Sequence, residues 1–221
     1  MNRVTFIDHC GFIVASEKVI MVFDMTDDPS HALHRSLESN PDLPVVFFVT
    51  NFHRDRVPHS IYELAQNRRR VYVMSNDVYP QNAPDSIEIA GMSAGDVIDT
   101  LPGGITVRAF ATTGRGVAFL VTEPGGTKIF HSGDLRYNPD ETERYKVIVN
   151  RIAEVTPTVD IAMIPFEDTT EGIDLFLEAV KVGDLFPAGL EKNRREACYA
   201  LRDKAKDAIH CLETPGQSLA L

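Results

Sequence analysis

In each half of the chain, patterns typical of strands come before patterns typical of helices, and this order restricts the fold strongly. Residues 4–7, 11–15 and 19–23 are short apolar or β-branched runs. The uninterrupted apolar run Val45–Val49 is typical of a strand that is covered on both faces. Residues 86–131 contain only strand-sized pieces and no helical pattern. The sequence therefore predicts two β-sheets rather than one.

Turn residues and helical stripes complete this prediction. Pro102-Gly103-Gly104 and Pro124-Gly125-Gly126 separate successive strand pieces, as hairpin turns do. Apolar residues at helical spacing predict helices at residues 29–40, 61–65, 145–153, 173–180 and 197–205. Further strands are expected at residues 71–74, 160–165 and 184–187, with a closing strand at 209–212. We expect one α/β domain, residues 1–221, with two sheets inside and helices outside.

Composition excludes several classes of protein. The 221 residues are 43% apolar and carry a formal charge of −10, so a buried core is expected and a nucleic-acid partner is not. The sequence has no apolar stretch long enough to span a membrane and no signal-peptide pattern at its start, so we expect a cytoplasmic protein. Cys10, Cys198 and Cys211 are widely spaced without a CxxC pair. That pattern fits a reducing compartment and argues against a disulfide framework or a thiolate zinc site.

Polar residues gather directly after three of the predicted strands. They occupy residues 50–56, 131–134 and 186–190. In α/β proteins, such strand ends usually carry the chemistry. Glu167 and Asp168 also follow a predicted strand, and we assign them to a solvated loop.

These strand ends resemble the motifs of the metallo-β-lactamase superfamily, the αββα sandwich of metal-dependent hydrolases. The first hairpin of that family is similar to residues 4–14, followed by Val22-Phe23-Asp24. The family's His-x-His-x-Asp-His motif falls on Asn51, His53, Asp55 and Arg56. Its later ligand segments resemble residues 112–121, 130–134 and 186–190, where Thr113, Asp134 and Gly189 stand at the ligand positions. The resemblance covers nearly the whole chain and implies a four-layer sandwich of two mixed sheets flanked by helices.

The resemblance also implies that most metal ligands have been lost. His53, Asp55 and Asp134 are retained, whereas Asn51 and Thr113 are weak donors and Gly189 offers no side chain. Arg56 has a permanent charge and no lone pair. We therefore predict no bound cofactor, and we hypothesise that Arg56 replaces the metal by pairing with Asp134 and Asp55. The predicted pocket consists of Asn51, His53, Asp55, Arg56, Thr113, Arg115, Asp134 and Gly189.

Three functions are compared. The favoured one is a metal-free relative of these hydrolases that binds a small molecule or regulates another process, because hydrolysis in the family depends on metal-activated water. The alternative is a metal-dependent hydrolase that holds zinc or another divalent metal with His53, Asp55 and Asp134, with Asp55 and Asp134 as its catalytic residues. A nucleotide-binding α/β protein is disfavoured by the central hairpins and by the lack of a glycine-rich phosphate loop. The sequence does not indicate substrate or oligomeric state.

Overall fold

The strand-first order of the sequence produces two β-sheets that pack face to face. The computed structural model describes residues 1–52, 59–80, 83–166, 169–189, 201 and 208–221. The first sheet has the order β13-β1-β2-β3-β4-β5-β6. Its strands are β1 (Arg3–Asp8), β2 (Gly11–Ala15), β3 (Ile20–Phe23), β4 (Val45–Val49), β5 (Arg70–Ser75), β6 (Glu88–Met92) and β13 (Ser218–Ala220).

The second sheet is built from the middle of the chain and the strand–helix region that follows. It has the order β12-β11-β10-β9-β8-β7. Its strands are β7 (Val97–Ile98), β8 (Thr106–Ala111), β9 (Val117–Thr122), β10 (Lys128–His131), β11 (Thr158–Pro165) and β12 (Lys181–Ala188). The hairpins predicted at the two Pro-Gly-Gly turns are confirmed, because β7 pairs with β8, and β9 with β10, in antiparallel register.

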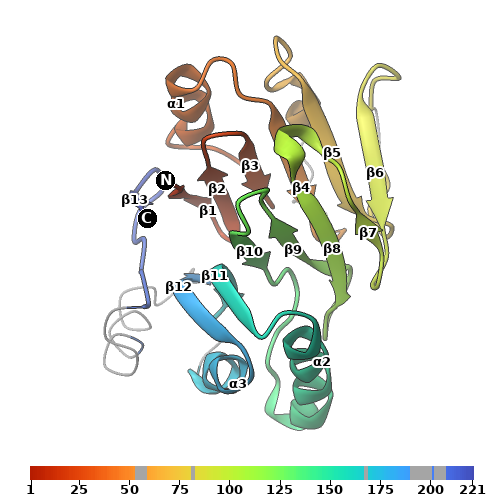
Figure 1. The fold of residues 1–221 in the computed structure, drawn as a ribbon, viewed down its shortest axis with the longest axis vertical. Coiled ribbons are helices and arrows are strands. Elements are labelled where there is room, and N and C mark those ends of the chain that lie inside the picture. Colours follow the sequence, from red (N-terminus) through yellow and green to blue (C-terminus); the bar gives the residue numbers. More distant parts are fainter. Residues whose placement is uncertain (53–58, 81–82, 167–168, 190–200, 202–207) are drawn as a thin grey trace.

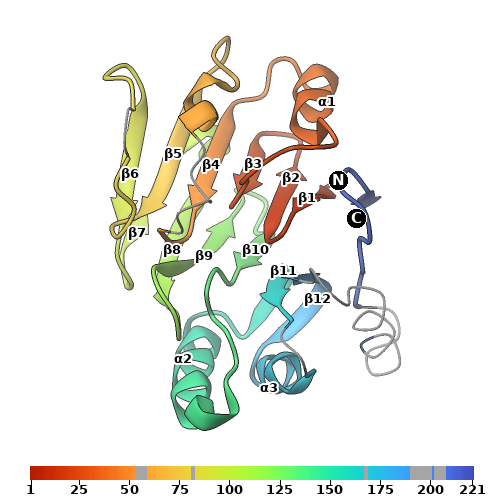
Figure 2. The same cartoon turned by 180° about the vertical axis from the view of Figure 1, so that it is seen from behind.

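Helices cover the outer faces of both sheets. The helix α1 (Ala32–Ser39) lies on the first sheet, and α2 (Thr142–Val155) and α3 (Glu171–Ala179) lie on the second, at the opposite side of the molecule (Figures 1 and 2). Short 3-10 helices are η1 (His59–Glu63), η2 (Pro102–Gly104) and η3 (Pro139–Glu141). None of the helices in the described ranges is long and apolar enough to cross a membrane.

Three hydrophobic cores correspond to the three interfaces between four layers. Phe23, Phe48 and Phe119 belong to the core between the two sheets. Tyr145 and Phe176 belong to the core between α2, α3 and the second sheet. A third core joins α1 and η1 to the outer face of the first sheet. Every residue of β4 is buried, as its unbroken apolar sequence predicts. The predicted αββα sandwich is confirmed.

The structure differs from the sequence-based expectations at three places. The helix expected at residues 61–65 is only the 3-10 helix η1, because Ala65 has a φ of 53° and turns the chain away. The strand expected at 209–212 is a single bridge between Ile209 and Leu185, and the closing strand is instead β13, which pairs with β1. The helix expected at 197–205 lies outside the described residues apart from Leu201.

The cysteines also differ from expectation. Cys10 is a buried thiol, but Cys211 is disulfide-bonded. The cysteine pattern argues against a disulfide framework, and the disulfide at Cys211 is a correction to that expectation. Which cysteines form disulfides depends on the fold and cannot be read from their spacing alone.

Candidate functional site

Loops from both sheets meet at one edge of the sandwich. The loops after β3, β4, β10 and β12 lie at the carboxyl ends of strands that pair in parallel with a neighbour. The β8–β9 hairpin joins them, because the amide of Val117 donates to the carbonyl of Thr50 over 2.8 Å. The β1–β2 hairpin also reaches this edge, where the carbonyl of His9 accepts a hydrogen bond from the amide of Gly189 over 3.1 Å. The topology thus gathers the predicted strand ends into one place.

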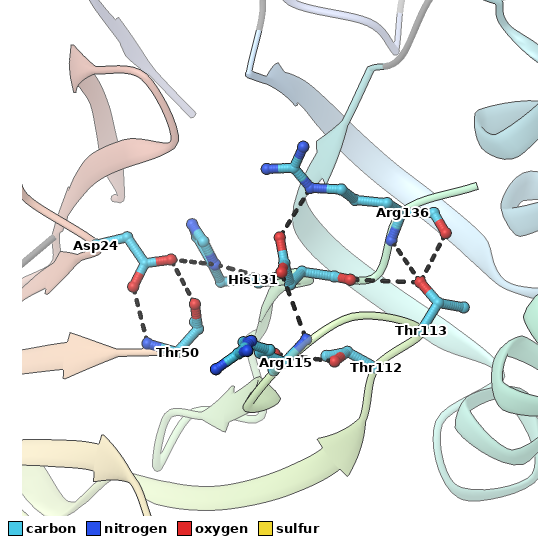
Figure 3. A network of polar contacts seen from close by, with 9 residues as sticks. Asp24, Thr50, Thr112, Thr113, Arg115, His131 and Arg136 are labelled. Carbon is cyan, nitrogen blue, oxygen red and sulfur yellow. Dashed lines mark hydrogen bonds and ion pairs between the residues drawn. The ribbon is translucent and has the colours of Figure 1, made fainter. Parts of the chain in front are cut away.

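A buried polar centre connects the two sheets beneath these loops (Figure 3). The carboxylate of Asp24, after β3, accepts bonds from the backbone N–H of Thr50 at 2.8 Å and from its hydroxyl at 2.6 Å. His131, at the end of β10, stacks on Phe23 with the two ring centroids 5.3 Å apart. Asp24, Thr50 and His131 are each at most 1% exposed. Because these polar groups are paired, they can be buried without a large free-energy cost.

The hydrogen bonds of His131 hold its imidazole ring in place and indicate its tautomer. Its Nε2 lies 2.9 Å from the carbonyl oxygen of Cys10, which only an N–H can satisfy. Its Nδ1 accepts from the amide of Gly133 at 3.2 Å, so this nitrogen carries no proton. The nearest Asp24 oxygen is 3.9 Å from Nδ1. His131 is therefore a structural residue whose two ring nitrogens are both occupied by hydrogen bonds.

Asp134, which the resemblance places at a metal-ligand position, is held by an arginine and a backbone amide. Its Oδ1 accepts from Nε of Arg136 at 2.8 Å, and its Oδ2 accepts from the backbone N–H of Arg115 at 3.4 Å (Figure 3). The hydroxyl of Thr113 donates to the carbonyl of Arg136 at 2.6 Å and accepts from its amide at 2.8 Å. Thr113, Arg115 and Asp134 thus form one hydrogen-bonded unit, which fastens the 112–116 loop to the 132–136 loop.

Glycines allow these loops to lie almost in backbone contact. A Cβ at Gly114 would stand 2.6 Å from Oδ2 of Asp134. A Cβ at Gly116, whose φ is 71°, would stand 2.0 Å from the carbonyl oxygen of Thr50, and one at Gly133 would stand 2.6 Å from that of Val117. Side chains cannot be accommodated at such distances. The edge is thus closely packed around Asp134.

The remaining predicted site residues lie around this unit or outside the described chain. Asn51 is buried at the end of β4. Gly189 follows β12 with a φ of 74°, and a Cβ there would meet only Cys10 Sγ within 4 Å, at 3.8 Å. The following predicted site residues lie outside the described residues: His53, Asp55 and Arg56. Glu167 and Asp168, which we assign to a loop, also lie outside them.

Arg136 was not among the residues that the sequence singled out. In the structure, Arg136 and the backbone amide of Arg115 hold Asp134. The proposed pairing of Arg56 stays a prediction. Asp24 and Thr50 both lie in segments that the sequence marks, but the hydrogen bonds between these two residues, which are 26 positions apart, are not evident from the sequence. Only the position of Asp24 at a strand end hints at its role.

The described residues do not fit a divalent cation. Asn51 supplies a neutral amide, the hydroxyl of Thr113 is engaged with Arg136, and Gly189 has no side chain. The carboxylate of Asp134 faces a guanidinium, which repels a metal ion. No cluster of three or more His, Cys, Asp or Glu side chains suited to a metal is found within the described ranges. Zinc needs three or four anionic, nitrogen or sulfur donors, and this part of the chain contributes one.

Arg136→Ala should loosen this edge and expose Asp134. The side chain of Arg136 is 51% exposed and that of Asp134 is 20% exposed, so the free energy of unfolding should fall by only about 1 kcal/mol. Urea unfolding measures this loss, and zinc titration should show a gain in affinity over the parent chain. Arg144→Ala is the matched control, because Arg144 is 52% exposed and pairs with Glu141 at 3.1 Å far from the site. If the two variants behave alike in both measurements, the Asp134–Arg136 pair is an ordinary surface contact.

Comparison with known proteins agrees with this architecture. A UPF0173 metal-dependent hydrolase of Methanosarcina mazei is 24% identical over 142 residues, which is 60% of this chain and 60% of that relative. Igni18, a metallo hydrolase from Ignicoccus hospitalis, has a TM-score of 0.72 at 15% identity and covers 99% of this chain and 97% of its own. The metallo-β-lactamase fold protein YhfI from Bacillus subtilis has a TM-score of 0.66 at 12% identity, with 100% of both chains covered. No protein-family model matches the chain. The superposed structures and the strand-end motifs together show that this chain has the metallo-β-lactamase fold.

Proposed function

We propose that this chain is a metal-free relative of the metallo-β-lactamase-fold hydrolases and acts as a binding or regulatory protein. One observation carries the proposal. Asp134, which the resemblance places at a metal-ligand position, has both carboxylate oxygens occupied by Arg136 and the Arg115 amide. A positive side chain then compensates the carboxylate in place of a cation.

Without a metal, the described part of the chain offers no evident means of activating water. Metal ions supply the nucleophile in such hydrolases by lowering the pKa of bound water towards about 7. Ser132 is buried and lacks a Gly-x-Ser-x-Gly elbow, and the neighbouring His131 cannot accept its proton because both ring nitrogens are engaged. Cys10 is buried in the core between the sheets. The described residues therefore favour binding over turnover.

A second candidate is a metal-dependent hydrolase with a reduced ligand set of His53, Asp55 and Asp134. The similarity to the Methanosarcina mazei metal-dependent hydrolase favours it. In that case Arg136 would have to leave Asp134 when metal binds, which costs one ion pair.

Metal content distinguishes the two candidates. Protein purified without chelator should contain zinc, manganese and iron well below one equivalent by elemental analysis, and Asp134→Asn should leave that content unchanged. The reason is that the carboxylate already has a positive partner and too few donors accompany it. Near-stoichiometric metal that disappears in Asp134→Asn would contradict the proposal and support the hydrolase.

A further inference from the structure

A groove of about 1000 Å³ lies at the other end of the first sheet, away from the candidate site. It is lined by residues of two segments, 28–41 and 63–68, which precede β4 and β5. The candidate site lies at the carboxyl ends of the strands, beyond Asn51. Since β4 has five residues, the two places are separated by about 16 Å of strand. Figure 2 shows α1, which forms one wall, on the outer face of this sheet.

The groove is held in shape by hydrogen bonds at both ends of α1. The carboxylate of Asp28 accepts from the amides of Ala32 at 2.7 Å and Leu33 at 2.9 Å, where the helix begins. The guanidinium of Arg68 donates to the carbonyls of Leu37, Asn40 and Leu43, where it ends. Anchoring of this kind completes the helix termini and preforms the groove, which lowers the entropy cost of binding.

Strained backbone points to this groove as well. The described chain has four non-glycine residues with positive φ, namely His9, Asp24, His31 and Ala65. Two of them, His31 with a φ of 54° and Ala65 with a φ of 53°, line the groove. The other two lie at the candidate site. A backbone in this conformation costs free energy, and such residues are often found at binding sites. The presence of both His31 and Ala65 in the lining therefore favours a functional role for the groove.

The charges on the groove select the kind of ligand. Its apolar walls include Leu37 and Leu64, and the exposed acids Glu38 and Glu63 belong to its two segments. Oε1 of Glu38 lies 3.0 Å from Nε2 of His34, which also lines the groove. Arg68 is the single arginine or lysine among the described residues of the lining, and its charge is directed to three backbone carbonyls. This lining therefore offers carboxylates to a cation, whereas to an anion it offers no uncommitted lysine or arginine and only the imidazoles of His31 and His34. The chain's net charge of −10 also attracts cations rather than anions.

We propose that this groove binds an organic ammonium ion with an apolar body. The apolar part lies along Leu37 and Leu64, and the ammonium group lies between Glu38 and Glu63. The volume suits a single small molecule, since ligand pockets usually measure about 300–1000 Å³. This assignment does not depend on the metal-free state of the candidate site.

Three ligands that share an eight-carbon chain and differ in their head group test the proposal. Octylammonium, octanoate and octan-1-ol are titrated into the intact protein below their micelle concentrations, with amide chemical shifts as the readout. Octylammonium should bind saturably, with its largest shifts at residues 31–38 and 63–68. Glu63→Gln should weaken it about threefold to fivefold, the usual size for one exposed charge pair. Glu143→Gln on α2, also at an exposed acid, should change nothing.

Each alternative outcome overturns the assignment. Equal affinity for octan-1-ol would show an apolar groove without charge selection. Tighter binding of octanoate than of octylammonium would show that the groove prefers an anion. Shifts confined to residues 112–116 and 131–136 would place the binding at the candidate site instead. Glu63 is exposed, so Glu63→Gln should fold and the comparison stays interpretable.

Discussion

A variant that carries Asn51→His, Arg56→His, Thr113→His and Gly189→His together should bind Zn²⁺ at least about a thousandfold more tightly than the parent chain. The four changes supply imidazoles at the positions where the resemblance places missing ligands. They also remove the arginine that the family motif does not contain. Equilibrium titration of the folded protein against a zinc-binding dye measures the gain.

The structure indicates which of these changes are costly. Gly189 has room for a side chain, since a Cβ there would stand 3.8 Å from Cys10 Sγ, but its φ of 74° strains any other residue. Thr113→His removes the two bonds to Arg136. Thermal melting must therefore accompany the titration. Adding Asp134→Ala to the same variant is the matched control and should abolish the gain. A folded variant that ignores zinc would count against the placement of the site.

Gly116→Ala should destabilise the fold by about 2–5 kcal/mol, because it adds overpacking to backbone strain. The new methyl group would lie 2.0 Å from the Thr50 carbonyl oxygen, and the backbone would keep a φ of 71°. The same carbonyl accepts the Val117 amide, so the β8–β9 hairpin would have to move away from β4. Urea unfolding should show a lower midpoint.

Substitutions at two other glycines distinguish overpacking from backbone strain as the cause of the lost stability. A Cβ at Gly125 or Gly126 would meet nothing within 4 Å, and of these two only Gly126 has positive φ, at 90°. Gly125→Ala should therefore be nearly neutral, and Gly126→Ala should cost only the strain, about 1 kcal/mol. A Gly116→Ala variant no less stable than Gly126→Ala would show that the loops yield easily and that the close packing has little energetic weight.

Much of the fold could be predicted from the sequence because its strands are strongly patterned. The apolar run of β4 and the Pro-Gly-Gly turns require little tertiary context, and both were predicted correctly. The errors occur where distant segments decide the outcome. The strand β13 exists because it pairs with β1, at the other end of the sequence. Likewise η1 ends at Glu63, shortly before Ala65, and an alanine gives no sign in the sequence of the left-handed backbone found there.

The candidate site was only partly accessible to sequence reasoning. The order of the motifs predicted that Thr113, Arg115 and Asp134 lie close together. They do so because all three are in loops that follow or join neighbouring strands of one sheet. It did not reveal that Arg136 would neutralise Asp134, because a two-residue separation carries no signal in a loop. Nor did it reveal the contact between Asp24 and Thr50, which depends on the parallel pairing of β3 with β4.

The close approach of the loops at Gly114, Gly116 and Gly133 has a consequence for how this scaffold can change over time. Enlarging any one of these positions displaces a neighbouring loop, so substitutions there are penalised together. At Gly189, by contrast, a side chain would have room, so an exchange there costs its own backbone strain but leaves the neighbouring loops in place. Ligand side chains can thus be replaced one at a time while the fold is retained. The fold of such a scaffold can therefore outlast a particular set of site residues.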